Sequence, residues 1–94
     1  MKEITKLKAA ILGSTGVVGQ RFIQLLDGHP WFDVTTVTGS DRTVGLTYGE
    51  AAKWRMDSPL SPKIAELTIQ GSEPDHIDAD VVFFHIVYDP SLIV

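Results

Sequence analysis

The sequence predicts an α/β protein in which helices cover a doubly wound, parallel sheet. Three observations lead to this fold class. The apolar run Ala9–Leu12 is typical of a central strand that is buried on both faces. It is followed by three glycines at three-residue intervals and then by a segment of helical periodicity, which together predict a strand, a tight turn and a helix. Beyond this unit, apolar and β-branched runs alternate with turn-rich segments, as in parallel sheets with right-handed crossovers.

The segment after the glycines is expected to be a helix that packs back on the sheet. Its predicted buried face consists of the apolar residues that recur at helical spacing, namely Val18, Phe22, Leu25 and Leu26. The helix should end within Asp27–Pro30, since Gly28 can adopt a left-handed cap and Pro30 cannot continue a helix.

Four strands and one further short helix are expected in all. The second to fourth strands are predicted at Phe32–Thr38, Leu67–Ile69 and Val81–Tyr88, the short helix within Tyr48–Met56, and a loop at Ser58–Pro62. The strand order would be 3-2-1-4, the first half of a Rossmann-like doubly wound sheet. Because the chain ends shortly after the fourth strand, we expect residues 1–94 to be a partial NAD(P)-binding domain. It would be truncated after that strand and lack a substrate or dimerisation domain.

The glycine-rich stretch Leu12–Arg21, LGSTGVVGQR, is of the type that binds dinucleotides. A nucleoside triphosphate loop would need a glycine at Val18 followed by a lysine, so that class is excluded. In a dinucleotide loop, Gly13 makes the tight turn, Gly16 lets the pyrophosphate approach the backbone and Gly19 lets the helix lie close to the strand. The residues predicted to contact the cofactor are Gly13, Ser14, Thr15, Gly16, Val17, Val18 and Gly19. The alternative is a helix N-terminus in which the glycines only allow tight packing.

The residues after the second strand favour NADP over NAD. Enzymes that bind NAD usually place a carboxylate at the end of this strand to accept from the ribose 2′-hydroxyl, whereas this strand ends at Thr38-Gly39. Ser40, Arg42 and Thr43 instead offer two hydroxyl groups and a guanidinium for a 2′-phosphate. Asp41 would repel that phosphate, and we expect its side chain to point away. The other interpretation is a polar, solvated turn.

The composition excludes several classes of partner and of chemical site. The 94 residues are 44% hydrophobic and 21% charged, which is typical of a folded domain. The net charge of -4 gives no general attraction to nucleic acid or to an anionic membrane. The chain has no cysteine, which excludes disulfides, thiolate metal sites and cysteine nucleophiles from it. Because no apolar segment is long enough for a signal peptide or a membrane span, we expect a cytoplasmic protein without a nucleic-acid or membrane partner.

Each histidine and tryptophan has a structural interpretation. We expect His29 to cap the helix or face solvent, and His85 to be a hydrogen-bonded residue within the fourth strand. His76 stands among aspartates whose spacing fits no compact metal site, so a solvated acidic turn is predicted and no metal ligand is assigned. Trp31 and Trp54 are expected to pack in the core or at an interface.

Three segments, in order, resemble the aspartate-semialdehyde dehydrogenases of the archaeal and fungal type. They are GSTGVVGQRFIQLLDGHPWF (Gly13–Phe32), SDRTVGLTYGEAAKW (Ser40–Trp54) and DADVVF (Asp78–Phe83). The resemblance implies an oxidoreductase of lysine, threonine and methionine biosynthesis that reduces L-aspartyl phosphate with NADPH. It also implies a catalytic cysteine, a histidine base and a substrate-binding arginine beyond the matched segments. No catalytic residue is therefore assigned in this chain, which is expected to be inactive alone.

The resemblance is expected to end at Phe83. Family members continue with a Ser-Ala-Leu-Pro-like turn that touches the cofactor, where this chain has Phe84–Tyr88. A frameshift or gene truncation would explain a tail at 84–94 that departs from the family. Other acyl-phosphate or acyl-CoA reductases, and a non-catalytic dinucleotide sensor, remain alternatives. An exposed outer strand predicts that stability needs the missing C-terminal half or homo-oligomerisation.

Overall fold

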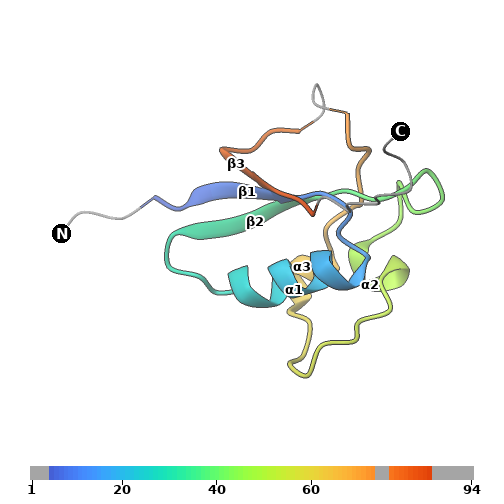
Figure 1. The fold of residues 1–94 in the computed structure, drawn as a ribbon, viewed down its shortest axis with the longest axis horizontal. Coiled ribbons are helices and arrows are strands. Elements are labelled where there is room, and N and C mark those ends of the chain that lie inside the picture. The colour runs from blue at the N-terminus through green and yellow to red at the C-terminus, as the bar shows by residue number, and fades with distance from the viewer. Residues whose placement is uncertain (1–4, 74–76, 86–94) are drawn as a thin grey trace, which may run out of the picture.

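The computed structural model describes residues 5–73 and 77–85, and its centre is a parallel sheet (Figure 1). The strands are β1 (Leu7–Ile11), β2 (Phe32–Val37) and β3 (Val81–Phe83), in the order β2-β1-β3. The helices are α1 (Val17–Leu26), α2 (Tyr48–Ala51) and α3 (Pro62–Ala65), and Figure 1 shows them together on one side of the sheet. The parallel sheet and its helices confirm the predicted Rossmann-like α/β class.

Strand β1 is the centre of the sheet. Ala9, Ala10 and Ile11 are completely buried, so both faces of the strand are covered, as the apolar run predicts. Helix α1 leads the chain to β2 on one side of β1, and β3 pairs with β1 on the other side. The direction of strand addition therefore reverses at β1. In such sheets, ligands bind beyond the carboxyl ends of the strands at the point of reversal.

The predicted third strand is in the right place but is not a regular strand. A single parallel bridge joins Gln70 to Thr38, just after the end of β2. The preceding residue, Ile69, bonds to the segment ahead of α2 instead, where its N–H donates to the Leu46 carbonyl at 2.8 Å. Because this segment is shared between two neighbours, it forms no continuous ladder with β2.

Strand β3 is shorter than the sequence predicts. It ends at Phe83, and the last three residues of the expected strand, 86–88, lie outside the described part of the chain. Pairing stops there because the partner strand β1 also ends, with Ile11 opposite Phe83. His85 therefore follows the strand and is exposed, which corrects the expectation that it lies within the strand.

Two short helices connect β2 to β3. Helix α2 covers only the first part of the predicted helix and begins with a capping box, in which Thr47 and Glu50 each bond to the other's backbone. Helix α3 begins inside the segment predicted as a loop. Its N-cap is Ser61, whose hydroxyl accepts from the Ile64 N–H at 3.4 Å, and Pro62 fits the first helical position because it needs no donor there.

The buried face of α1 differs in part from the predicted one. Leu26 is buried as expected, but Leu25 is 59% exposed and Val18 is 37% exposed. The residues of α1 that are buried are Gly19, Gln20, Ile23 and Leu26. An apolar pattern alone misses this face, because a glycine and a glutamine are among its buried residues.

The turn after α1 forms as predicted. Gly28 has a φ of 74°, the left-handed conformation expected of a helix-ending glycine. The His29 Nδ1 atom accepts from the Trp31 N–H at 3.0 Å, so the imidazole stabilises this turn. Trp31 is 65% exposed and is not part of the core, whereas Trp54 packs against the core as expected.

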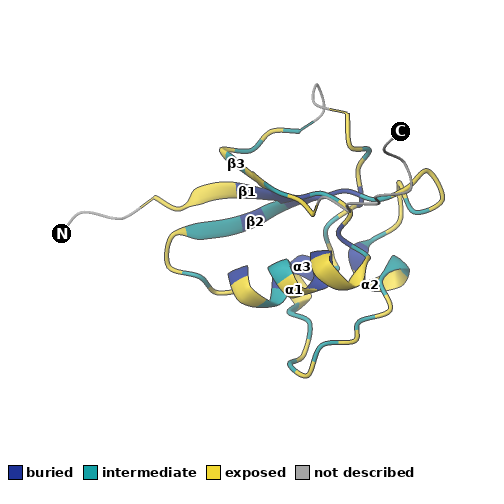
Figure 2. Cartoon of the chain, in the orientation of Figure 1, coloured by how far each residue is buried: buried dark blue, intermediate teal, exposed yellow. Residues whose placement is uncertain are grey.

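Tyr48 ties the core to the glycine-rich loop. The buried residues gather where β1 and β2 face the helices (Figure 2), and Tyr48 is the largest side chain among those that are completely buried. Its hydroxyl donates to the Ser14 carbonyl at 2.6 Å. Burial raises the pKa of this phenol well above its usual value. The start of α2 is thereby connected to the loop between β1 and α1.

Replacing Tyr48 with phenylalanine should destabilise the fold without changing its shape. The ring still fills the core, but the buried carbonyl of Ser14 loses its donor, which costs about 1 to 3 kcal/mol of unfolding free energy. Urea denaturation followed by circular dichroism measures this difference. If the Tyr48→Phe variant is as stable as the wild type, the hydrogen bond contributes nothing to folding.

The same variant tests the direction of the pKa shift. Burial raises the pKa of Tyr48 above its usual value of 10.0, so the folded state favours the neutral phenol. This contribution is complete below pH 10 and is lost as the pH rises above it. The wild type should therefore lose stability above pH 10 more steeply than Tyr48→Phe does, and equal slopes would contradict the assignment.

Candidate functional site

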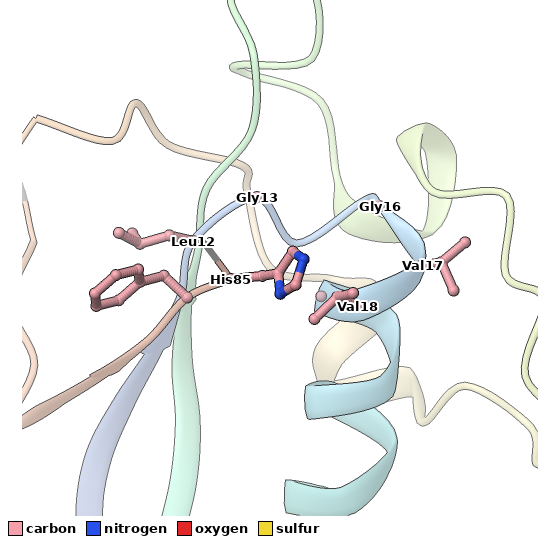
Figure 3. A pocket seen from close by; sticks show the side chains of 8 residues that line it. Leu12, Gly13, Gly16, Val17, Val18 and His85 are labelled. Carbon is pink, nitrogen blue, oxygen red and sulfur yellow. The ribbon is translucent and has the colours of Figure 1, made fainter. Parts of the chain in front are cut away.

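The glycine-rich loop joins the end of β1 to the start of α1 at the carboxyl edge of the sheet (Figure 3). Gly13 has a φ of 62°, a left-handed conformation that strains most other residues. This geometry fits the tight turn that the sequence predicts for it. Gly16 follows as the N-cap residue of α1, with a φ of -74°.

The fold requires a glycine at position 19 but not at position 16. A Cβ atom on Gly19 would lie 2.4 Å from the Gly13 carbonyl oxygen and 2.7 Å from the Ser14 Cα atom, so no side chain fits between helix and loop. A Cβ atom on Gly16 would lie 3.7 Å from the nearest atom, which is an ordinary contact. Its φ also suits any residue. Close packing therefore requires a glycine at position 19, whereas position 16 has space for a side chain.

Thr38, directly after β2, holds the loop in place. Its carbonyl oxygen accepts from the Ser14 N–H at 2.9 Å and from the Ser14 Oγ at 2.7 Å. Its hydroxyl oxygen accepts from the Gly13 N–H at 3.3 Å. Ser14 and Thr38 are both completely buried. The fold thus uses the side chain of Ser14, one of the residues predicted to contact the cofactor, to fix the loop.

Gln20, which no sequence motif pointed to, also holds the loop in place. Its Nε2 group donates to the carbonyl oxygens of Thr15, at 2.9 Å, and Lys53, at 3.0 Å. Its Oε1 atom accepts from the Arg55 N–H at 2.8 Å. This buried amide fixes the loop to the segment after α2. The available signal was its position next to Gly19, because the neighbour of a tightly packed glycine lies close to the same buried face.

The N-terminus of α1 is suited to a negatively charged ligand. No side chain caps it, and its first turn contains no acidic residue. The first N–H groups of a helix have no partner within the helix and carry the positive end of its dipole. Gly16, Val17 and Val18 at this end are exposed. Together these properties are those of helix ends that bind phosphate groups.

A pocket of about 510 Å³ lies against this helix end (Figure 3). It is bounded by the loop, by the first turn of α1 and by Phe84 and His85, the two residues after β3. The pocket therefore lies beyond the carboxyl ends of β1 and β3, where the strand order reverses, and its volume is that of a small-molecule site. The predicted contact residues that line it are Gly13, Gly16, Val17, Val18 and Gly19; Ser14 and Thr15 do not.

The second predicted group, Ser40, Arg42 and Thr43, lies in the turn that follows β2. Ser40 and Arg42 are exposed, and so is Asp41 between them. The Thr43 hydroxyl donates to the Ser40 carbonyl at 3.0 Å and so holds the turn itself. The donors that this turn presents to a ligand are the Ser40 hydroxyl and the Arg42 guanidinium. Because the turn begins two residues after Thr38, both predicted groups lie at the same edge of the sheet.

The described residues contain neither a metal-binding cluster nor a membrane-spanning helix. Within residues 5–73 and 77–85, no three side chains of His, Cys, Asp or Glu come together to hold a metal ion. His76 lies outside these ranges, and so does part of its expected acidic turn. Over the same residues, no helix has the length and apolar character needed to cross a membrane.

Several known sequences, including the following two, are similar to this chain over most of its length. Aspartate-semialdehyde dehydrogenase from Archaeoglobus fulgidus is 40% identical over 78 residues, which cover 83% of this chain and 23% of the relative. Malonyl CoA reductase (NADP) from Metallosphaera sedula is 35% identical over 78 residues, or 82% of this chain and 22% of the relative. This chain thus spans less than a quarter of the length of these relatives.

This chain is also similar to a solved structure and to a described protein family. The crystal structure of aspartate-semialdehyde dehydrogenase with NADP from Candida albicans superposes with a TM-score of 0.77 and 38% identity, covering 85% of this chain and 23% of that one. Residues 8–87 match the family described as semialdehyde dehydrogenase, NAD binding domain, so the match extends past Phe83. The chain therefore belongs to the family of semialdehyde dehydrogenase NAD-binding domains.

Proposed function

We propose that the chain binds NADP and forms the cofactor-binding part of an aspartate-semialdehyde dehydrogenase. Such an enzyme reduces L-aspartyl phosphate to L-aspartate semialdehyde, and bound NADPH supplies the hydride. The family match supports a dinucleotide, and the NADP of the Candida albicans neighbour supports this choice of cofactor. The name of the Archaeoglobus fulgidus relative supports the substrate.

The proposal rests mainly on one observation, which is that position 16 holds a glycine although a side chain would fit there. The fold has space for a side chain there, because an added Cβ atom makes only an ordinary contact and the backbone conformation suits any residue. A ligand that must lie directly on the backbone does need one. A pyrophosphate bound to the N–H groups of the first turn of α1 is such a ligand.

The two groups of the site have separate tasks in this proposal. The backbone N–H groups of the first turn of α1, Val17–Gly19, would hold the pyrophosphate, while the Gly16 N–H donates to the Gly13 carbonyl at 3.3 Å. Ser40 and Arg42 would hold the 2′-phosphate, since a guanidinium forms strong charge-assisted hydrogen bonds with phosphate oxygens. The bonds from Thr38 to Ser14 already fix the loop, so little conformational entropy is lost when the cofactor binds.

Reduction of an acyl thioester is a second candidate. It is supported by the malonyl CoA reductase (NADP) of Metallosphaera sedula, which is 35% identical over 78 residues. The glycine loop and the turn after β2 would serve either reaction, because both use the same cofactor. The two candidates differ in the substrate-binding part, which must be supplied to distinguish them.

Mixing the chain with a separately expressed C-terminal segment of a relative tests the enzyme activity. With the segment from Archaeoglobus fulgidus we expect phosphate-dependent reduction of NADP by aspartate semialdehyde, and neither part should be active alone. The segment from Metallosphaera sedula, assayed with malonyl-CoA and NADPH, is the matched comparison. Activity with only the second segment would favour the thioester reductase, and NADP binding without activity in either mixture would indicate a non-catalytic binding module.

Replacing Gly16 with valine should weaken NADP binding about 100-fold or more. The branched side chain separates the pyrophosphate from at least two N–H groups, and each charge-assisted hydrogen bond contributes about 1.5 to 3 kcal/mol. The loss of the glycine N-cap should cost only about 1 kcal/mol of stability, so the variant should still fold. Isothermal titration calorimetry measures the affinity, and circular dichroism checks the fold.

Gly71→Val is the matched control for this variant. An added Cβ atom on Gly71 meets only the carboxylate of Glu73, at 3.8 Å, and the residue does not line the pocket at α1. This control should bind NADP as the wild type does. A folded Gly16→Val variant with unchanged affinity would refute the assignment of the loop.

Replacing Arg42 with alanine should weaken NADP binding about 10- to 100-fold and leave NAD binding nearly unchanged, because only NADP carries the 2′-phosphate. Arg21→Ala removes the same charge from the exposed surface of α1, where Arg21 bonds to Gln24, and should affect neither cofactor. Calorimetric titrations with both cofactors make the comparison. An equal loss of NAD and NADP affinity in Arg42→Ala would show that Arg42 does not read the 2′-phosphate.

A further inference from the structure

His85 lies in the pocket at the N-terminus of α1, yet the proposed function assigns it no task. It is the second residue after β3 and is exposed. Its imidazole projects into the pocket toward Val18, below the turn at Gly13 (Figure 3). The side chain therefore faces the same space as the helix end that would hold the pyrophosphate.

Among the described residues, His85 has no charged neighbour in the pocket. The other described residues that line the pocket are glycines, aliphatic residues and Phe84, so neither a carboxylate nor another cation shares this space. The acidic residues that precede β3 are engaged elsewhere, since Asp80 accepts from the Lys8 N–H at 2.8 Å and Asp78 pairs with the Lys8 ammonium at 3.3 Å. They lie at the opposite end of the strand from His85.

Imidazole is suited to this position because it changes charge near neutral pH. The neutral ring has one N–H donor, and the imidazolium has two donors and a positive charge. A doubly negative pyrophosphate next to it favours the charged form. Cofactor binding and protonation of the ring would then stabilise each other.

We propose that His85 donates a hydrogen bond to the cofactor pyrophosphate across the pocket from α1, so that dinucleotide binding takes up a proton on this imidazole. The inference rests on the proposed function, because it assumes that a dinucleotide occupies the pocket. It adds a contact from the carboxyl end of β3 to those from the glycine loop. The affinity for the dinucleotide should therefore rise as the pH falls through the titration range of histidine.

The experiment uses NAD as the probe and the whole chain as the protein. NAD lacks the 2′-phosphate, whose second ionisation near pH 6 would otherwise contribute to the pH dependence. From pH 8 to pH 5.5 we expect the association constant to rise about 5- to 10-fold, which is the difference between a charge-assisted hydrogen bond and a neutral one. Calorimetry in two buffers of different ionisation enthalpy should also detect proton uptake when NAD binds near pH 7.

Two variants of His85 separate its charge from its shape. His85→Gln keeps a donor without the titration and should bind NAD weakly at every pH. His85→Lys keeps a positive charge throughout and should bind NAD tightly at every pH. His29→Gln is the control, because His29 follows the far end of α1 and bonds to Trp31, and it should keep the wild-type pH profile.

Several outcomes would overturn the inference. They are a pH-independent affinity in the wild type, an unchanged pH profile in His85→Gln, or tighter binding by His85→Gln at every pH, which would mean that the imidazole obstructs the pocket. The proton-uptake measurement needs no variant and so decides the matter even if a substitution prevents folding. If Gly16→Val abolishes binding while the His85 variants behave as the wild type, the proposed function stands and only this inference fails. If the wild type binds neither NAD nor NADP, both fail.

Discussion

The contact of α1 with the loop at Gly19 is the constraint on which the site depends. Since no side chain fits between Gly19 and the backbone of Gly13 and Ser14, the helix can begin directly beside the turn that ends β1. Its N-terminus then lies at the carboxyl edge of the sheet, next to the reversal of strand order between β2 and β3. The exposed N–H groups and the pocket at this edge follow from that placement.

Buried polar side chains keep the loop in a single conformation. Thr38 binds the loop from the end of β2, Gln20 from within α1 and Tyr48 from the start of α2. Each of these side chains bonds to a backbone atom of the loop. The Ser14 carbonyl that accepts from Tyr48 is buried, and a buried carbonyl without a donor is costly in a protein interior. A phosphate-binding loop that is already ordered loses little entropy when a ligand binds, so the core residues contribute to the proposed function without touching the cofactor.

Local patterns predicted the unit of strand, turn and helix, because these elements depend on backbone conformation and on neighbouring residues. The tight turn at Gly13, the close packing at Gly19 and the left-handed Gly28 belong to this class. The bonds of Gln20 and Tyr48 could not be predicted, since their partners lie 33 and 34 residues away and are brought close only by the folded sheet. The same reason explains the irregular third strand, which depends on two neighbours at once.

An amide NMR titration with NADP is the most direct measurement of the central claim, which is that the pyrophosphate lies on the N-terminus of α1. The account predicts that the largest shifts occur at the amides of Gly16–Gly19, with a second group at Ser40–Thr43. The amides of α3 should stay in place, because this helix does not line the pocket. Saturating NADP that leaves the Gly16–Gly19 signals unmoved, or that shifts only residues elsewhere, would contradict the account.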